Sequence, residues 1–198
     1  QFRVGFTLNT AIGQGATTVT ALQLALSYGA LGNGGTLYEP QLVRAVETAD
    51  GTIVQDFSPR VRRRVVIRPE DLAVVQRGLW GVVNEEKGTA YGERLPDIDV
   101  AGKTGTAQVS HLRYKSGDET RIWYFNRDHA WFSCYAPSRA PEIAVVTLIE
   151  HGGAGGRHAA PVALSVIREY ERLKAERAEK AKGGSSKPPT NQAGGKSP

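Results

Sequence analysis

The strand-like segments of this chain are grouped into hairpins, and helical segments stand before and after the groups. Residues 130–135 and 143–149 form two apolar runs joined by a turn that contains Pro137 and Pro141. Another predicted strand, within residues 100–109, precedes them. This grouping predicts an antiparallel sheet flanked by helices, which is the α+β class of fold, because a parallel sheet would need helices and strands that alternate one by one.

A buried helix is predicted near the beginning of the chain, over residues 21–31. It follows a loop punctuated by glycines at residues 11–15, and Gly32-Asn33-Gly34-Gly35 ends it. Three threonines are candidates for its N-cap: Thr17, Thr18 and Thr20. We expect burial all round because apolar residues cover most of the helix circumference. These residues are Leu22, Leu24, Ala25, Leu26 and Leu31.

A hairpin is predicted next, with strands over residues 41–47 and 52–57 and with Asp50-Gly51 at the turn. A group of arginines follows it and contributes to the formal net charge of +5. The group consists of Arg60, Arg62, Arg63 and Arg64. A solvated edge strand is the favoured interpretation over nucleic-acid binding, because no aromatic side chains stand between the charges.

Two further helices are predicted. The first begins at Pro69 and runs to about residue 86, and its apolar stripe consists of Leu72, Val75, Leu79, Val82 and Val83. The second follows the glycine cluster at residues 152–156 and spans residues 159–181. The residues expected on its core side are Val162, Val166, Ile167, Tyr170 and Leu173, and Glu176 is expected to pair with Lys180 on the outer side.

The chain has 198 residues, contains no methionine and starts within a pattern rather than at a leader segment. We therefore expect it to be the C-terminal portion of a longer polypeptide, with residues 1–182 forming part of a domain. Residues 183–198 are rich in Gly, Ser, Pro and Lys, a composition that predicts a disordered tail. No apolar run is long enough to span a bilayer, so we expect any membrane anchor to lie upstream.

The segment Lys103-Thr104-Gly105-Thr106 carries the main functional signal of the sequence. It places a cation, two hydroxyls and a position without a side chain on one predicted strand. Because side chains alternate along a strand, Lys103 and Gly105 are expected on one face, and Thr104 and Thr106 on the other. Threonine hydroxyls beside an ammonium group are suited to hold a peptide carboxylate, so the segment predicts one wall of a substrate cleft.

Several segments together resemble the transpeptidase domain of class B penicillin-binding proteins, in particular the elongation-type penicillin-binding protein 2 group. The resemblance covers about residues 1–182. The matching segments are Ile12-Gly13-Gln14-Gly15 with Thr20-Ala21-Leu22-Gln23-Leu24-Ala25, Asn33-Gly34-Gly35-Thr36 with Tyr38-Glu39-Pro40, the Lys103-Thr104-Gly105 motif, Asp128-His129-Ala130-Trp131-Phe132 with Tyr135-Ala136-Pro137, and Gly152 to Gly156 before Ala159-Ala160-Pro161.

The resemblance implies a membrane-anchored peptidoglycan D,D-transpeptidase of the bacterial periplasm. Such an enzyme crosslinks stem peptides that end in D-Ala-D-Ala, works with the cell-wall elongation machinery, is acylated by β-lactams, and uses neither metal nor other cofactor. By this analogy Lys103 supports the electrostatics of the site, and Thr104, Gly105 and Thr106 bind substrate. The N–H of Thr106 is then a donor to the oxyanion and makes this residue catalytic as well.

One departure from the family pattern limits what this chain can do alone. The family takes its nucleophile from a Ser-x-x-Lys motif and uses a Ser-x-Asn motif in proton transfer, and neither occurs here. We therefore expect the nucleophile upstream and this chain to be inactive by itself. Two alternatives remain open: a D,D-carboxypeptidase or β-lactamase relative, and a non-catalytic domain that senses β-lactams or serves as a scaffold.

Five other features have structural interpretations beside the functional ones. His129 is favoured as a structural histidine over a catalytic base, and Trp131 as a packing residue that also forms part of the cleft wall. Gln14 is a candidate for the cleft wall or for fixing its loop. Cys134, the single cysteine, is expected to be an inert buried thiol. The glycines of residues 152–156 do not match a phosphate-binding loop, since no Gly-Lys-Ser/Thr ending follows.

Overall fold

The computed structural model describes residues 4–11, 13–15, 17–109 and 123–183. The longer helices are α1 (Val4–Ala11), α2 (Ala21–Gly32), α3 (Pro69–Asn84) and α4 (Gly155–Gly183), and there are short 3₁₀ helices η1 (Tyr91–Glu93) and η3 (Tyr124–Asn126). The strands are β1 (Thr36–Tyr38), β2 (Ala45–Glu47), β3 (Ile53–Asp56), β4 (Val61–Arg64), β5 (Ala101–Ala107), β6 (His129–Ala136) and β7 (Ile143–Ile149). Residues 184–198 of the predicted tail lie outside the described residues.

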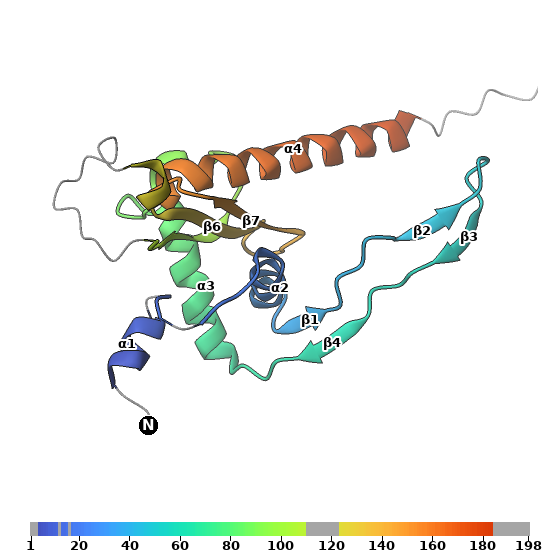
Figure 1. Cartoon of the computed structure of the whole chain (residues 1–198). Helices are drawn as coiled ribbons and strands as arrows, with labels where there is room; N and C mark the ends of the chain where they lie inside the picture. Colours follow the sequence, from blue (N-terminus) through green and yellow to red (C-terminus); the bar gives the residue numbers. More distant parts are fainter. Residues whose placement is uncertain (1–3, 12, 16, 110–122, 184–198) are drawn as a thin grey trace, which may run out of the picture.

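The centre of the molecule is a three-stranded antiparallel sheet in the order β5-β6-β7. Helix α4 lies along one face of this sheet, while α2 and α3 lie on the opposite side (Figure 1). The sheet therefore separates two helical layers, which confirms the predicted α+β class. Its strands agree with the predictions for residues 100–109, 130–135 and 143–149 to within a few residues.

Side chains on the two faces of β6 belong to two separate clusters of core residues. Its even-numbered side chains, Ala130, Phe132, Cys134 and Ala136, are fully buried beneath α4. Tyr135 points to the opposite face and packs with Leu79 of α3, beside Tyr28 of α2. Because successive side chains of β6 point to opposite faces of the sheet, this one strand contacts both helical layers.

The ends of α2 and α3 follow the signals in the sequence. Thr20 is the N-cap of α2, and a reciprocal pair of hydrogen bonds between Thr20 and Gln23 forms a capping box. Pro69 opens α3, as predicted. The expectation that α2 is buried all round is wrong for Leu22, which keeps 56% of its surface exposed, because the sheet contacts only one side of the helix.

Helix α4 differs from the prediction in its start and in its core side. It begins at Gly155 rather than at residue 159. Val162 and Val166 are each 45% exposed and Leu173 is 36% exposed, so the prediction that they form the core side is wrong. Ile167 is fully buried, as predicted, and the other residues that face the sheet are mostly small: Ala159, Ala160, Ala163 and Leu164. Small side chains bring the helix axis close to the sheet, and this closeness turns the larger valines outward.

The outer face of α4 is stabilised by ion pairs other than the predicted one. Glu176 pairs with Arg172 instead of Lys180, and Arg172 also bonds Glu169. Lys174 reaches across to Glu142 in the β6–β7 turn at 2.6 Å, and this hydrogen bond with its charge lowers the pKa of Glu142. No helix in the described part of the chain has the length and hydropathy needed to cross a membrane.

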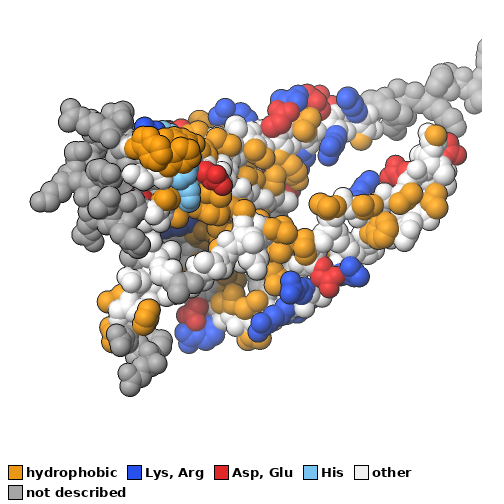
Figure 2. Space-filling view, viewed as in Figure 1, with side chains coloured by type: hydrophobic (Ala, Val, Ile, Leu, Met, Phe, Trp, Pro, Cys, Tyr) orange, Lys and Arg blue, Asp and Glu red, His pale blue; other side chains and the backbone are white. Residues whose placement is uncertain are grey.

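Strands β1 to β4 form an extended ribbon that leaves the body of the protein (Figure 1). The predicted hairpin is present as β2 and β3, although both strands are shorter than predicted, and β1 pairs with β4 closer to the body. All of β4 is exposed, which confirms the interpretation of its arginines as part of a solvated strand. Figure 2 shows basic and apolar side chains along this ribbon.

The two neighbouring positions Ile167 and Val166 test the orientation of α4. We expect Ile167→Ala to lower the free energy of unfolding by about 2–5 kcal/mol, because this side chain is fully buried against the sheet. The control Val166→Ala removes a half-exposed side chain and should change stability by less than about 1 kcal/mol. Urea unfolding of the two variants gives the comparison, and equal losses would contradict the orientation.

The thiol of Cys134 should resist alkylation in the folded protein. Burial raises its pKa to about 12, and its sulfur donates to the carbonyl oxygen of Val145. We expect iodoacetamide at pH 8 to leave Cys134 unmodified until a denaturant is added, as measured by mass spectrometry of the peptide that contains it. Rapid modification without denaturant would show that the strand opens readily.

Candidate active site

The Lys103-Thr104-Gly105-Thr106 segment lies on β5, the edge strand of the three-stranded sheet. Thr104 and Thr106 pair with Phe132 and Ala130, two residues buried on the α4 side. Cross-strand partners lie on the same face of a sheet, so both threonine side chains point toward α4. Lys103 and Gly105 take the opposite face, where Gly105 pairs with Trp131. The predicted separation of the two pairs is confirmed.

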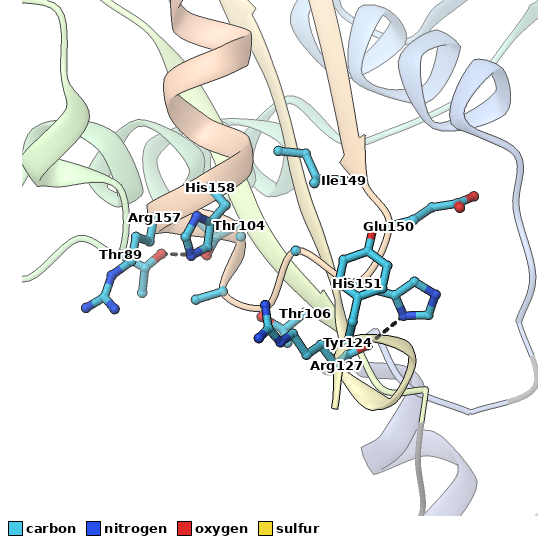
Figure 3. Close-up of a pocket in the computed structure, with 14 residues that line it drawn as sticks. Thr89, Thr104, Thr106, Tyr124, Arg127, Ile149, Glu150, His151, Arg157 and His158 are labelled. Carbon is cyan, nitrogen blue, oxygen red and sulfur yellow. Dashed lines mark hydrogen bonds between the residues drawn. The ribbon is translucent and has the colours of Figure 1, made fainter. Parts of the chain in front are cut away.

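A cavity of about 1020 Å³ opens where β5 meets the beginning of α4 (Figure 3). The hydroxyls of Thr104 and Thr89 lie 2.7 Å apart in its wall and share a hydrogen bond. Other segments contribute to the lining, which consists of Thr89, Thr104, Thr106, Tyr124, Arg127, Ile149 to Gly152 and Ala154 to His158. The cavity is therefore assembled from four separate parts of the chain.

Main-chain groups of β5 face the open edge of the sheet at the two threonines. The side-chain amide of Gln14 donates to the carbonyl oxygen of Thr106 at 3.1 Å, and Nζ of Lys103 donates to that of Thr104 at 2.8 Å. In an antiparallel strand the N–H and C=O of one residue point to the same side. The N–H groups of Thr104 and Thr106 consequently point toward this edge as well, away from β6.

Glycines allow the first turn of α4 to lie directly on the strands. A β-carbon on Gly155 would stand 2.3 Å from the carbonyl oxygens of Gly105 and Trp131. A β-carbon on Gly156 would stand 2.2 Å from the carbonyl oxygen of Thr89. Both distances are far below van der Waals contact. Any residue other than glycine at these positions would therefore require the helix to move.

The electrostatics of the cavity favour an anion. Its charged and titratable lining residues are Arg127, Arg157, His151, His158, Tyr124 and the single carboxylate residue Glu150. The N-terminus of α4, which carries a partial positive charge, adds to the two arginines. Threonine hydroxyls that donate hydrogen bonds beside these charges can bind a carboxylate. Within the described ranges, no three His, Cys, Asp or Glu side chains come together as a metal site.

The other predicted site residues lie around the cavity rather than inside it. Lys103 is exposed on the face of β5 opposite the cavity, and Trp131 is half-buried over Gly105 on that same face. Gln14 lies at the open edge of β5. His129 accepts a hydrogen bond from the backbone N–H of His151 at its Nδ1, a structural contact of the kind favoured from the sequence.

Sequence reasoning missed several residues of the cavity wall. Thr89, Arg127 and His151 stand in no recognisable motif and reach the site only through folding. Arg157 and His158 follow directly on the glycine cluster, which the sequence analysis excluded only as a phosphate-binding loop. A glycine-rich entry into a helix, followed by cationic residues, was the available signal for an anion-binding wall.

Comparisons with known proteins agree with this geometry. Residues 3–168 match the family model of the penicillin-binding protein transpeptidase domain. The peptidoglycan D,D-transpeptidase MrdA of Haemophilus influenzae is 34% identical over 171 residues, which are 84% of this chain and 26% of that protein. The chain therefore spans about a quarter of the length of this curated relative.

Among the solved structures similar to this fold are two of penicillin-binding proteins. The ceftriaxone acyl-enzyme complex of penicillin-binding protein A from Mycobacterium tuberculosis matches with a TM-score of 0.64 and 30% identity, over 81% of this chain and 34% of that one. The complex of penicillin-binding protein 2 with MreC from Helicobacter pylori matches with a TM-score of 0.61 and 30% identity, over 86% of this chain and 28% of that one.

The close contact between α4 and β5 can be tested at Gly155. We expect Gly155→Ala to displace the first turn of α4 and to lower the thermal stability, because its β-carbon would overlap two carbonyl oxygens. The matched control is Gly78→Ala in α3, where the new β-carbon meets no atom within 4 Å. That change should leave the free energy of unfolding unchanged or raise it by up to about 1 kcal/mol, because alanine favours a helix more than glycine does. Similar melting temperatures for the two variants would contradict the packing described.

Proposed function

This chain belongs to the penicillin-binding protein transpeptidase family, and we propose on that basis that it forms the carboxylate-binding wall of a peptidoglycan D,D-transpeptidase. The observation that carries the proposal is the position of Thr104 and Thr106. Their hydroxyls point into a cationic cavity, while their N–H groups face the open edge of β5. A substrate peptide that lies along this edge can be bound through both its carboxylate and its main chain.

The proposed reaction is acyl transfer through a serine ester. A serine hydroxyl attacks the carbonyl carbon of the penultimate D-alanine, and the C–N bond to the terminal D-alanine breaks, so that free D-alanine leaves. The amine of a second stem peptide then attacks the ester and restores the serine. Because the sequence holds no Ser-x-x-Lys motif, this serine belongs to a part of the protein outside the present chain.

Each residue of the β5 segment has a separate role in this proposal. Thr104 and Thr106 bind the terminal carboxylate of the stem peptide or the carboxylate of a β-lactam. The N–H of Thr106 donates to the carbonyl oxygen as it becomes negatively charged. Lys103 adds positive charge from the opposite face of the strand, and Gly105 leaves space beside Trp131.

The cellular setting of the whole protein is proposed from its relatives. A catalytic domain in the periplasm, with an anchor in the bacterial inner membrane outside this chain, suits a substrate that is part of the cell wall. The complex of the similar Helicobacter pylori protein with MreC supports a partner from the cell-wall elongation machinery.

The hydroxyl of Thr104 provides the test of the carboxylate site. In the full-length protein we expect Thr104→Val to slow acylation by benzylpenicillin by roughly 10- to 150-fold, since a hydrogen bond to a charged group contributes about 1.5–3 kcal/mol. Thr104→Ser keeps the hydroxyl and should remain within a few-fold of the original rate. The rates are measured from the mass of the intact covalent adduct over time, and equal rates for Val and Ser would contradict this role.

The unaltered full-length protein is the reference for that experiment, and it also tests the proposed reaction. One penicillin adduct per molecule, located on a serine outside residues 1–198, supports the acyl-enzyme mechanism. Absence of any adduct would favour the non-catalytic alternative. Rapid release of the adduct by water, without transfer to an amine acceptor, would favour the carboxypeptidase or β-lactamase alternative.

A further inference from the structure

The loop between β7 and α4, residues 150–154, connects the sheet to the cationic end of the cavity. We call it the pocket loop. It contributes Glu150, His151, Gly152 and Ala154 to the cavity lining and continues directly into Gly155. His151 has a φ of 55° and is the one non-glycine residue with a positive φ in the described part of the chain. A β-carbon disfavours this backbone conformation, so contacts from elsewhere have to maintain it.

Three consecutive residues just before and at the start of β6 form hydrogen bonds with this loop, and the rings of Tyr124 and Phe125 also contact the ring of His151. The backbone N–H of His151 donates to Nδ1 of His129 at 2.9 Å, and the two imidazole rings lie 4.8 Å apart. The N–H of Gly153 donates to the carbonyl oxygen of Asp128 at 2.8 Å. The ring of His151 in turn contacts the carbonyl oxygen of Arg127 at 3.1 Å, as the dashed line in Figure 3 marks.

Among these contacts, only the one at His129 takes its acceptor from a side chain. The carbonyl oxygens of Arg127 and Asp128 would be present whatever residues stood there. Replacement of His129 therefore removes the acceptor of the His151 N–H and leaves the other two bonds in place. This N–H belongs to the residue with the disfavoured φ, so the bond stabilises the one non-glycine residue of the described chain that has this backbone conformation.

We propose that His129 is a positioning residue of the cavity, and that it acts only in its neutral form. To accept from the N–H of His151, Nδ1 must carry a lone pair, so the single ring proton lies on Nε2. A second proton on the ring would place an N–H at Nδ1, directly against the donor N–H of His151. Protonation thus removes the bond and loosens the pocket loop at His151, which lies in the cavity lining next to the first turn of α4.

Several charged and titratable groups lie on the segments that neighbour His129. The segments next to it carry these titratable and charged groups: His151 and Glu150 in the pocket loop, Arg127 and Asp128 before β6, and Tyr124 of η3, which packs on the ring of His151. In β5, the residue paired with His129 is Ala107, and its side chain carries no charge. Asp128 is engaged through its side chain with the N–H of Val109 at 3.2 Å.

The functional consequence rests on the proposed acylation reaction. When His129 is protonated, the backbone of His151 in the cavity lining is no longer held in one position, so anion binding weakens. Acylation efficiency should therefore be lower at pH 5.5 than at pH 7.5, because a second proton on the ring of His129 removes the hydrogen bond. The fall should appear mainly in the concentration of penicillin needed for half-maximal rate, rather than in the limiting rate of acylation.

Two substitutions at His129 separate this role from simple packing. His129→Asn keeps an acceptor oxygen close to the position of Nδ1 but cannot be protonated in this pH range. His129→Leu offers no acceptor. In the full-length protein at pH 7.5, we expect benzylpenicillin acylation within about threefold of the original for Asn and a loss of about 10-fold or more for Leu, which corresponds to about 1.4 kcal/mol or more. The decline in acylation efficiency between pH 7.5 and 5.5 that is due to His129 should disappear in the Asn variant.

His151→Asn is the matched control for the second imidazole of the pair. Asparagine tolerates the left-handed backbone conformation and retains the N–H that donates to His129, while the ring of His151 is lost. The acid decline should persist in this variant if it belongs to His129. A decline that disappears in His151→Asn and persists in His129→Asn would overturn the proposed pH dependence.

Hydrogen–deuterium exchange of the peptide that contains residues 149–154 tests the positioning without any reaction. We expect faster exchange in His129→Leu at pH 7.5 and near-original exchange in His129→Asn. Equal exchange in all three proteins would overturn the positioning role, and a Leu variant that does not fold leaves the pH profile of the Asn variant as the decisive result. If the original protein forms no penicillin adduct at any pH, the proposed function fails, whereas the exchange comparison still decides the role of His129.

Discussion

The close packing of the first turn of α4 on strands β5 and β6 is the contact on which the rest of the site depends. It requires glycine at 155 and 156, because a β-carbon at either position would overlap carbonyl oxygens of the strands or of Thr89. Alanines at 159, 160 and 163 continue the same close approach farther along the helix. Helix, sheet and cavity are consequently fixed relative to one another by one set of small residues.

This contact gives the edge of β5 its particular chemistry. The threonine side chains turn toward the helix, whose N-terminus and Arg157 supply positive charge, while the main-chain groups of the same residues turn toward the open edge. A ligand that binds there meets side-chain donors on one side and main-chain donors on the other. The pocket loop completes the arrangement, and a hydrogen bond from its backbone to His129 joins it to the sheet.

Much of the fold could be predicted from local patterns, and the differences have a physical cause. Thr20 and Pro69 specify helix starts through hydrogen bonding and a fixed φ, which act within a few residues. The core side of α4 was predicted at its larger apolar residues, and this failed at Val162 and Val166 because a helix that approaches a sheet closely buries alanines. The pairing of β1 with β4 joins residues far apart in sequence, and no local signal marked it.

The sequence by itself determined the α+β class, the β5 segment with its two threonines, and the family to which these motifs belong, because alternation, capping and motif spacing are properties of short segments. Tertiary structure alone decided which other residues join those threonines. Thr89, Arg127, His151 and Arg157 come from different loops and a helix end, and they meet only after α4 packs on the sheet. The role of His129 was likewise decided by folding, since its partner is a backbone N–H that lies 22 residues away in the chain.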